Sequence, residues 1–178
     1  ASGNETTFGR IITFDDNSAY GYGRVRIASA ATGHNADDYH LYGVRKVLMV
    51  TGLPETRREK GQTDPQPAAK RPSKPAPFWA DEQSLIVRAM VLTGGKLVVA
   101  GPPDLRKKEV GILAYSNEEE SLASLKGEKG VMLRVVDTTD GSTVSEQSLD
   151  AMPVFDGMSA ARGRVFVSLK NGEVQCWQ

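Results

Sequence analysis

The chain has 178 residues, which suits one domain with a sizeable core. It carries 22 basic and 22 acidic residues, and this zero formal charge removes the usual electrostatic case for binding nucleic acid or an anionic membrane. No apolar run approaches the roughly 20 residues of a membrane helix. The single cysteine, Cys176, excludes a disulfide within the chain.

The N-terminal part predicts a unit of antiparallel strands over residues 9–50. Residues 9–27 form a hairpin pattern with Asp16 and Asn17 at its turn. Residues 28–38 are small and polar, which is typical of a loop. The alternation over residues 39–50 predicts a third strand that runs on into a fourth.

Residues 54–77 differ sharply in composition from the strands before them. They hold six of the nine prolines and almost no apolar residues. Proline removes ladder donors, and the few apolar side chains cannot offset the entropy of ordering. We therefore expect an exposed, poorly ordered insertion in the single domain 1–178. A basic docking segment for an acidic partner is the alternative, and the tolerated insertion is favoured over it.

Two more strand-rich units follow, over residues 85–150 and 152–178. In the first of them, residues 85–92 and 96–100 predict a hairpin, and residues 104–129 are a second insertion. That insertion contains a short helix from about Ser116, because a capping residue is followed by three glutamates and two leucines. The last unit supplies three strands.

The second and third units repeat one pattern. Met90 aligns with Met158, Gly95 with Gly163, and residues 97–99 with 165–167. Repeated hairpins of this kind predict an all-β fold of antiparallel four-stranded β-propeller blades, about three of them, with one inserted helix. We expect the following side chains to be buried between blades: Phe14, Met90, Val98, Val165 and Val167.

The count of units predicts an incomplete ring, since closed propellers have about four blades or more. Two routes to completion remain open. Residues 1–8 would supply the strand that the unit 152–178 lacks, or two copies would meet edge to edge as a dimer that completes one ring. We expect the second route, in which the partner is another copy. A protein partner or the remainder of a larger propeller fills the same role.

The sequence offers few candidate catalytic or metal-binding residues. His34, Asp38 and His40 are a candidate metal site, but the six-residue spacing of the histidines suits neither one strand face nor a helical zinc motif, so solvent-exposed loop residues are favoured. Cys176 has no base near it in sequence, and we expect a buried small hydrophobe.

Other polar and aromatic clusters have structural interpretations. Asp15 and Asp16 are favoured as turn formers over an acid–base pair, and residues 118–120 as the acidic first turn of a helix. Four tyrosines would line a binding face or, as is commoner on half-buried strands, pack in the core. They are Tyr20, Tyr22, Tyr39 and Tyr42. No catalytic, cofactor-binding or metal residue is assigned.

The segment from Val135 to Val144, together with residues 153–177, resembles the quinoprotein-dehydrogenase-like β-propeller superfamily of PQQ-like repeats. The blade motif of that family reads Ala-x-Asp-x-x-Thr-Gly-x-x-x-Trp. Asp137 and Gly141 match its Asp and Gly, whereas Val135, Asp140 and Ser145 replace its Ala, Thr and Trp. The resemblance extends well over residues 85–101 and 130–178, and loosely over 9–50.

This resemblance implies the C-terminal portion of a larger bacterial propeller protein, periplasmic or extracellular. Its catalytic members hold the quinone with a ring disulfide of adjacent cysteines and a calcium site. One cysteine rules out that disulfide, so we expect no cofactor and a noncatalytic interaction or scaffold domain. The alternative is part of a PQQ-dependent oxidoreductase whose catalytic residues lie outside this chain.

Overall fold

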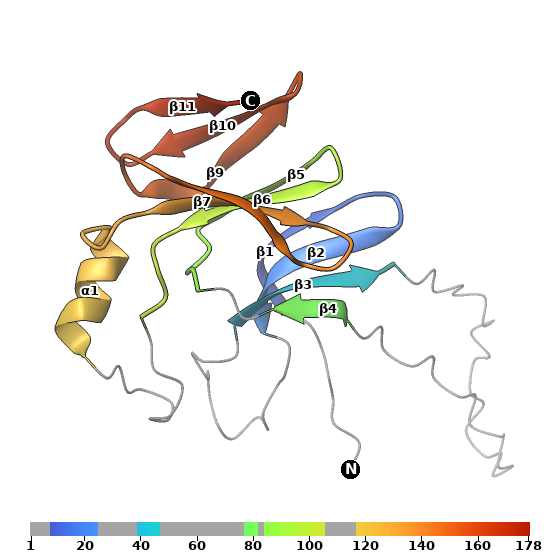
Figure 1. Cartoon of the computed structure of the whole chain (residues 1–178), viewed down its shortest axis with the longest axis horizontal. Helices are drawn as coiled ribbons and strands as arrows, with labels where there is room; N and C mark the ends of the chain where they lie inside the picture. The colour runs from blue at the N-terminus through green and yellow to red at the C-terminus, as the bar shows by residue number, and fades with distance from the viewer. Residues whose placement is uncertain (1–7, 25–38, 47–76, 82–83, 106–116) are drawn as a thin grey trace, which may run out of the picture.

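The computed structural model describes residues 8–24, 39–46, 77–81, 84–105 and 117–178. Within these ranges the chain folds into three antiparallel sheets and one short helix (Figure 1). The expected all-β class is confirmed. In each sheet the strands are neighbours in the order in which they follow along the chain, so each sheet is a meander.

The first sheet has the order β1-β2-β3-β4. These strands are β1 (Phe8–Phe14), β2 (Ser18–Arg24), β3 (Tyr39–Arg45) and β4 (Pro77–Asp81). The fourth strand therefore follows residues 47–76, which lie outside the described residues, as do residues 54–76 of the expected insertion. Pro77 instead begins β4, an edge strand of this sheet, where a missing N–H is tolerated.

The second sheet has the order β5-β6-β7-β8. Its strands are β5 (Ala89–Thr93), β6 (Lys96–Gly101), β7 (Met132–Asp137) and β8 (Thr143–Ser148). The predicted hairpin of β5 and β6 is confirmed, and both glycines of its turn, Gly94 and Gly95, have positive φ. The strand starts later than expected, because Leu85 makes only an isolated bridge, to Pro103.

The third sheet has three strands in the order β11-β10-β9. They are β9 (Pro153–Ala161), β10 (Arg164–Leu169) and β11 (Val174–Trp177). Met158 pairs with Val167 as Met90 pairs with Val99 in the second sheet. The equivalence of the two hairpins that the sequence predicts is therefore confirmed in register.

The helix α1 (Glu118–Lys126) is also confirmed. The Asn117 side chain accepts a hydrogen bond from the backbone N–H of Glu120, at 3.2 Å, which satisfies one of the open donors of the first turn. The helix turns its serines, not its leucines, to the protein. Ser121 and Ser124 are buried, and the Ser124 hydroxyl donates to the carbonyl of Pro103, at 2.5 Å.

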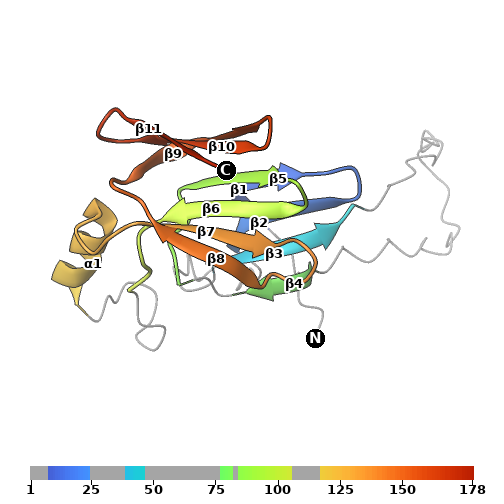
Figure 2. The ribbon, with the colours of Figure 1, turned by 45° about the horizontal axis from the view of Figure 1, so that its top comes forward.

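The three sheets pack face to face, with the second sheet in the middle (Figures 1 and 2). The first strands of the sheets lie beside each other, β5 contacting both β1 and β9. A backbone hydrogen bond of 2.8 Å from Asp156 of β9 to the carbonyl of Arg88, just before β5, links the second and third sheets.

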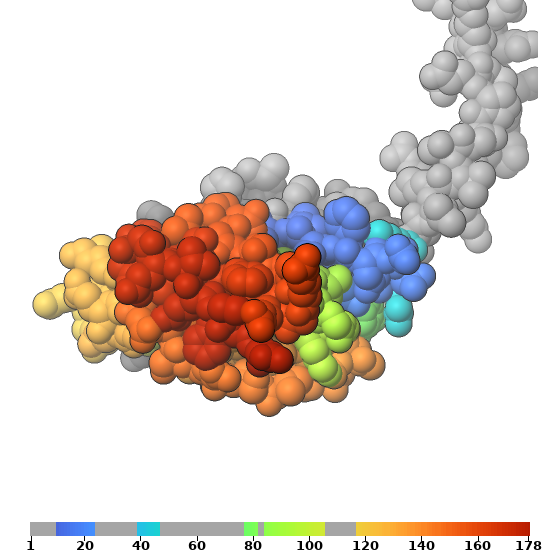
Figure 3. All heavy atoms as spheres, turned by 90° about the horizontal axis from the view of Figure 1, so that it is seen from above, coloured from blue at the N-terminus to red at the C-terminus, as the bar shows by residue number. Residues whose placement is uncertain are grey.

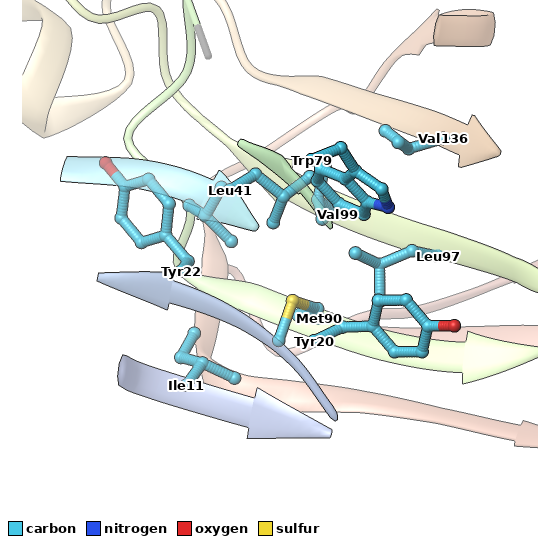
Figure 4. Packing of buried hydrophobic residues seen from close by; sticks show 10 residues of the cluster. Ile11, Tyr20, Tyr22, Leu41, Trp79, Met90, Leu97, Val99 and Val136 are labelled. Carbon is cyan, nitrogen blue, oxygen red and sulfur yellow. The ribbon is translucent and has the colours of Figure 1, made fainter. Parts of the chain in front are cut away.

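Two apolar clusters separate the sheets. The cluster between the first and second sheets (Figure 4) consists of Ile11, Tyr20, Tyr22, Leu41, Trp79, Val87, Met90, Leu97, Val99 and Val136. The cluster between the second and third sheets consists of Val98, Ala100, Val131, Leu133, Leu149, Met152, Val167 and Leu169. Strands β5 to β7 of the middle sheet are therefore packed on both faces, whereas the residues of β8 are exposed.

Of the five residues predicted to be buried between blades, four are buried or half-buried and one is exposed. Met90, Val98 and Val167 are buried as expected, and Val165 is half-buried against the second cluster. The prediction for Phe14 is wrong, since its side chain is 67% exposed. Side chains on a strand alternate between faces, and in β1 the inward set includes Ile11. Phe14 lies three positions later and so points away from the second sheet.

Candidate functional site

The most specific contact between sheets is made by Trp79 of β4. Its indole Nε1 donates a hydrogen bond of 2.9 Å to the carbonyl of Thr138, in the turn between β7 and β8. A Cβ added to Gly141 of the same turn would lie 2.7 Å from the indole Cε3. The ring therefore rests directly on the glycine backbone. We call Trp79, Thr138 and Gly141 the tryptophan dock.

The turn that receives the indole is held by Asp137. One carboxylate oxygen of Asp137 pairs with the Lys96 ammonium, and the other accepts a 2.8 Å hydrogen bond from the backbone N–H of Thr139. These donors, Lys96 first, lower the pKa of Asp137 to about 2. The Thr138 hydroxyl also donates to the carbonyl of Gly95, at 2.7 Å, which joins this turn to the β5–β6 turn. Asp137 thus positions the dock rather than offering a free carboxylate.

The expectations from the sequence assign no role to Trp79. The available signal was the aromatic pair Phe78-Trp79, directly after the proline-rich residues and followed by polar ones. Trp79 is 8% exposed and stacks on Tyr20 at a centroid distance of 6.2 Å. A buried tryptophan needs a partner for its N–H, and here the partner lies in the next sheet.

Of the three candidate metal residues, the structure describes only His40. His34 and Asp38 lie outside the described ranges, whereas His40 is half-buried in β3 and pairs with Gly23 of β2. In the described part of the chain, no group of three or more His, Cys, Asp or Glu side chains is placed to hold a metal ion. The candidate site falls mostly outside the described residues, so it stays a prediction from the sequence.

Cys176 is exposed, so the prediction of a buried hydrophobe is wrong. It pairs with Phe166 of β10, on the face of the third sheet that points away from the second sheet. Its neighbour Trp177 faces the opposite way and packs on the inner cluster. The alternation of β11 thus places the thiol on the surface.

The structural interpretation of the aspartate turn is confirmed for Asp15. Its carboxylate accepts backbone hydrogen bonds from Asn17, at 2.8 Å, and from Ser18, at 2.7 Å. These two donors hold the pKa of Asp15 below its ordinary value. The three glutamates 118–120 lie in the first turn of α1, as expected.

The tyrosines pack rather than form an open binding face. Tyr20, Tyr22 and Tyr42 are buried and Tyr39 is half-buried. The Tyr22 hydroxyl donates to the carbonyl of Leu85, at 3.4 Å, which links β2 to the segment that precedes β5. The packing interpretation from the sequence is confirmed.

Both ends of the stack of sheets expose apolar side chains. On the first sheet, the leading face consists of Ile12, Phe14 and Val44, of which Ile12 is 56% and Phe14 67% exposed. On the third sheet, the trailing face consists of Phe166, Val174 and Cys176, and Val174 is 63% exposed. Strands β9 to β11, in orange and red, form the central part of the surface seen in Figure 3. Large apolar side chains gathered on a surface are typical of contact sites.

In the part of the chain that the structure describes, no helix has the length and apolar character needed to cross a membrane. A scan against models of protein families found no match to this chain, and a search of curated proteins found no match either.

Proposed function

We propose that this chain is a noncatalytic interaction or scaffold domain built as part of a β-propeller. The observation that carries the proposal is that the interface between neighbouring sheets occurs twice with the same residue positions. A stack with such a repeat grows into a ring of blades, and propellers serve mainly as platforms that present their surfaces to partners.

The repeat extends to individual pairs of residues that lie opposite each other on neighbouring strands. Leu97 pairs with Val136 in the second sheet, and Val165 pairs with Trp177 at the same positions of the third. Leu97 and Val136 belong to the cluster shared with the first sheet, whereas Val165 and Trp177 pack on the cluster shared with the second. The second and third sheets therefore use the same face to contact the sheet before them.

The tryptophan dock adds support. The resemblance to PQQ-like repeats rests on Asp137 and Gly141, and these two residues form the turn on which Trp79 rests. The motif of the second sheet has Ser145 where the family has tryptophan, but the sheet before it supplies an indole. Under this proposal the chain belongs to a larger bacterial protein outside the cytoplasm, a location that rests on the resemblance alone.

The residues present do not fit the quinone cofactor of the catalytic members. The chain has one cysteine, so it cannot form the disulfide of adjacent cysteines. Its described acidic residues do not gather into a group for calcium. Asp137, the motif carboxylate, is paired with Lys96. The residues of this chain therefore support a noncatalytic domain, whereas the alternative, part of an oxidoreductase, requires catalytic residues outside this chain.

Titration of the folded chain with PQQ and calcium tests the proposal, with absorbance of the quinone as the readout. We expect no saturable change, and the same trace from the heat-unfolded chain as the control for adventitious binding. Stoichiometric, calcium-dependent binding by the folded chain alone would contradict the scaffold and favour part of an oxidoreductase.

A further inference from the structure

The exposed face of the third sheet corresponds, residue by residue, to a covered face of the second sheet. In the middle sheet, the face turned to the third sheet carries the pairs Val98–Val135 and Ala100–Leu133. By the same register, the third sheet carries the pairs Phe166–Cys176 and Ser168–Val174 at these positions. Three of these four residues, Phe166, Val174 and Cys176, form the trailing face. The trailing face thus repeats a surface that, one sheet earlier, is covered by a neighbour.

The leading face has the complementary position. In the second sheet, Met90 and Leu92 of the first strand face the sheet before them. Ile12 and Phe14 are likewise two positions apart on β1, and both side chains lie on the side away from the second sheet. The leading face therefore carries large apolar side chains where a preceding sheet would pack, and the described residues of this chain include no fourth sheet.

We propose that a second copy of this chain covers both faces, so that the leading face of each copy packs on the trailing face of the other. This inference rests on the proposed propeller function. Each contact is heterologous, because the leading face of one copy meets the trailing face of the other. Two such contacts join the two copies into a closed dimer with two-fold symmetry. Two copies of a three-sheet chain reach the range of roughly four to eight blades in which propellers close.

A second copy is the occupant that the residues favour, because the complement of each face is found at the other end of the same molecule. We expect the proposed contact between copies to be weaker than the contacts between sheets within one chain. Ser168 replaces Ala100, and Ser159 replaces Val91, so less apolar surface is buried.

Sedimentation over a nanomolar to high micromolar range tests the proposal. We expect the wild-type chain to change from its monomer mass of 19.2 kDa to twice that value. Phe14→Asp on the leading face and Val174→Asp on the trailing face should each abolish the dimer. Val144→Asp is the matched control, because Val144 is 55% exposed on β8, outside both faces, and its dimer should persist.

Mixing the two monomeric variants tests the head-to-tail arrangement. The trailing face of the Phe14→Asp chain and the leading face of the Val174→Asp chain are both intact, so one of the two contacts returns and the mixture should form a heterodimer. If Phe14→Asp fails to fold, Ile12→Asp replaces it, at a side chain 56% exposed. A mixture that stays monomeric would overturn the head-to-tail contact.

A wild-type chain that stays monomeric at every concentration, with a native near-ultraviolet circular dichroism spectrum, would overturn the dimer. That result would leave the scaffold proposal standing, because the scaffold is contradicted by binding of PQQ and calcium and not by the mass. The two proposals thus fail in separate measurements.

Discussion

Trp79 and Gly141 are in direct contact although they belong to different sheets. The indole ring occupies the space that a Cβ on Gly141 would need, and Gly141 has a φ of 81°, which only glycine adopts without strain. The contact joins an outer strand of the first sheet to a turn at the outer edge of the second. It therefore links the two sheets at the margin of their shared apolar cluster, to which Trp79 itself belongs.

Replacing Val167 with Asp should abolish folding. The Val167 side chain is fully buried between the second and third sheets, and an unpaired buried charge costs several kcal/mol. Urea unfolding followed by circular dichroism should show no cooperative transition. Val144→Asp, at an exposed site on β8, should stay within about 0.5 kcal/mol of wild type. A soluble V167D protein with a cooperative transition would show that the strand phase is wrong.

Asp137 should make the stability of the chain depend on pH. Its pKa is lowered from 3.8 to about 2 in the folded protein by Lys96 and Thr139. A lowered pKa contributes stability that is present above the unfolded value, and that is lost as the pH falls from about 4 toward 2. Asp137→Asn should lower the urea midpoint at neutral pH, and its difference from wild type should shrink on acidification.

The matched control for this prediction is Asp16→Asn, which changes an exposed carboxylate in another turn. Its urea midpoint at neutral pH should stay close to that of wild type. A difference between wild type and D137N that stays constant from neutral pH to about pH 2 would contradict the proposed role of the Lys96 pair.

Replacing Asn117 with Ala should destabilise α1. The Asn117 side chain accepts the backbone N–H of Glu120, and losing such a cap costs about 1 kcal/mol. Hydrogen exchange should show faster exchange of the first-turn amides of the helix. Leu122→Ala is the control, because its side chain is 52% exposed and carries no capping group. Equal exchange rates in N117A and wild type would contradict the cap.

The sequence predicted the strands and turns well, because their signals are local. Gly95 and Gly163 lie in hairpin turns with positive φ, and the repeat of Met90 and Met158 is a true equivalence in register. The helix was found from its cap and its acidic first turn. These features depend on a few neighbouring residues and so can be read without the fold.

The predictions that failed depend on which face of an element meets the protein. Phe14 and Cys176 lie on the outer faces of end sheets, and strand alternation alone does not tell an outer face from an inner one. The helix turns Ser124 inward, where its hydroxyl donates a hydrogen bond to the distant Pro103 carbonyl. The tryptophan dock joins residues about sixty positions apart, a contact that no local pattern reveals.

A double-mutant cycle on the tryptophan dock tests most directly whether neighbouring sheets are coupled as described. Trp79→Ala should cost about 3–5 kcal/mol of unfolding free energy in urea. Gly141→Ala should cost more than Gly172→Ala, the control, because Gly172 has a similar φ, of 90°, but no atom within 4 Å of its added Cβ.

In the Trp79→Ala background the clash at Gly141 is absent, so Gly141→Ala should there cost only about as much as Gly172→Ala, on the order of 1–2 kcal/mol. The account predicts this loss of additivity between the two sites. An equal cost of Gly141→Ala in both backgrounds would contradict the contact between Trp79 and Gly141, and with it the coupling of the first sheet to the second.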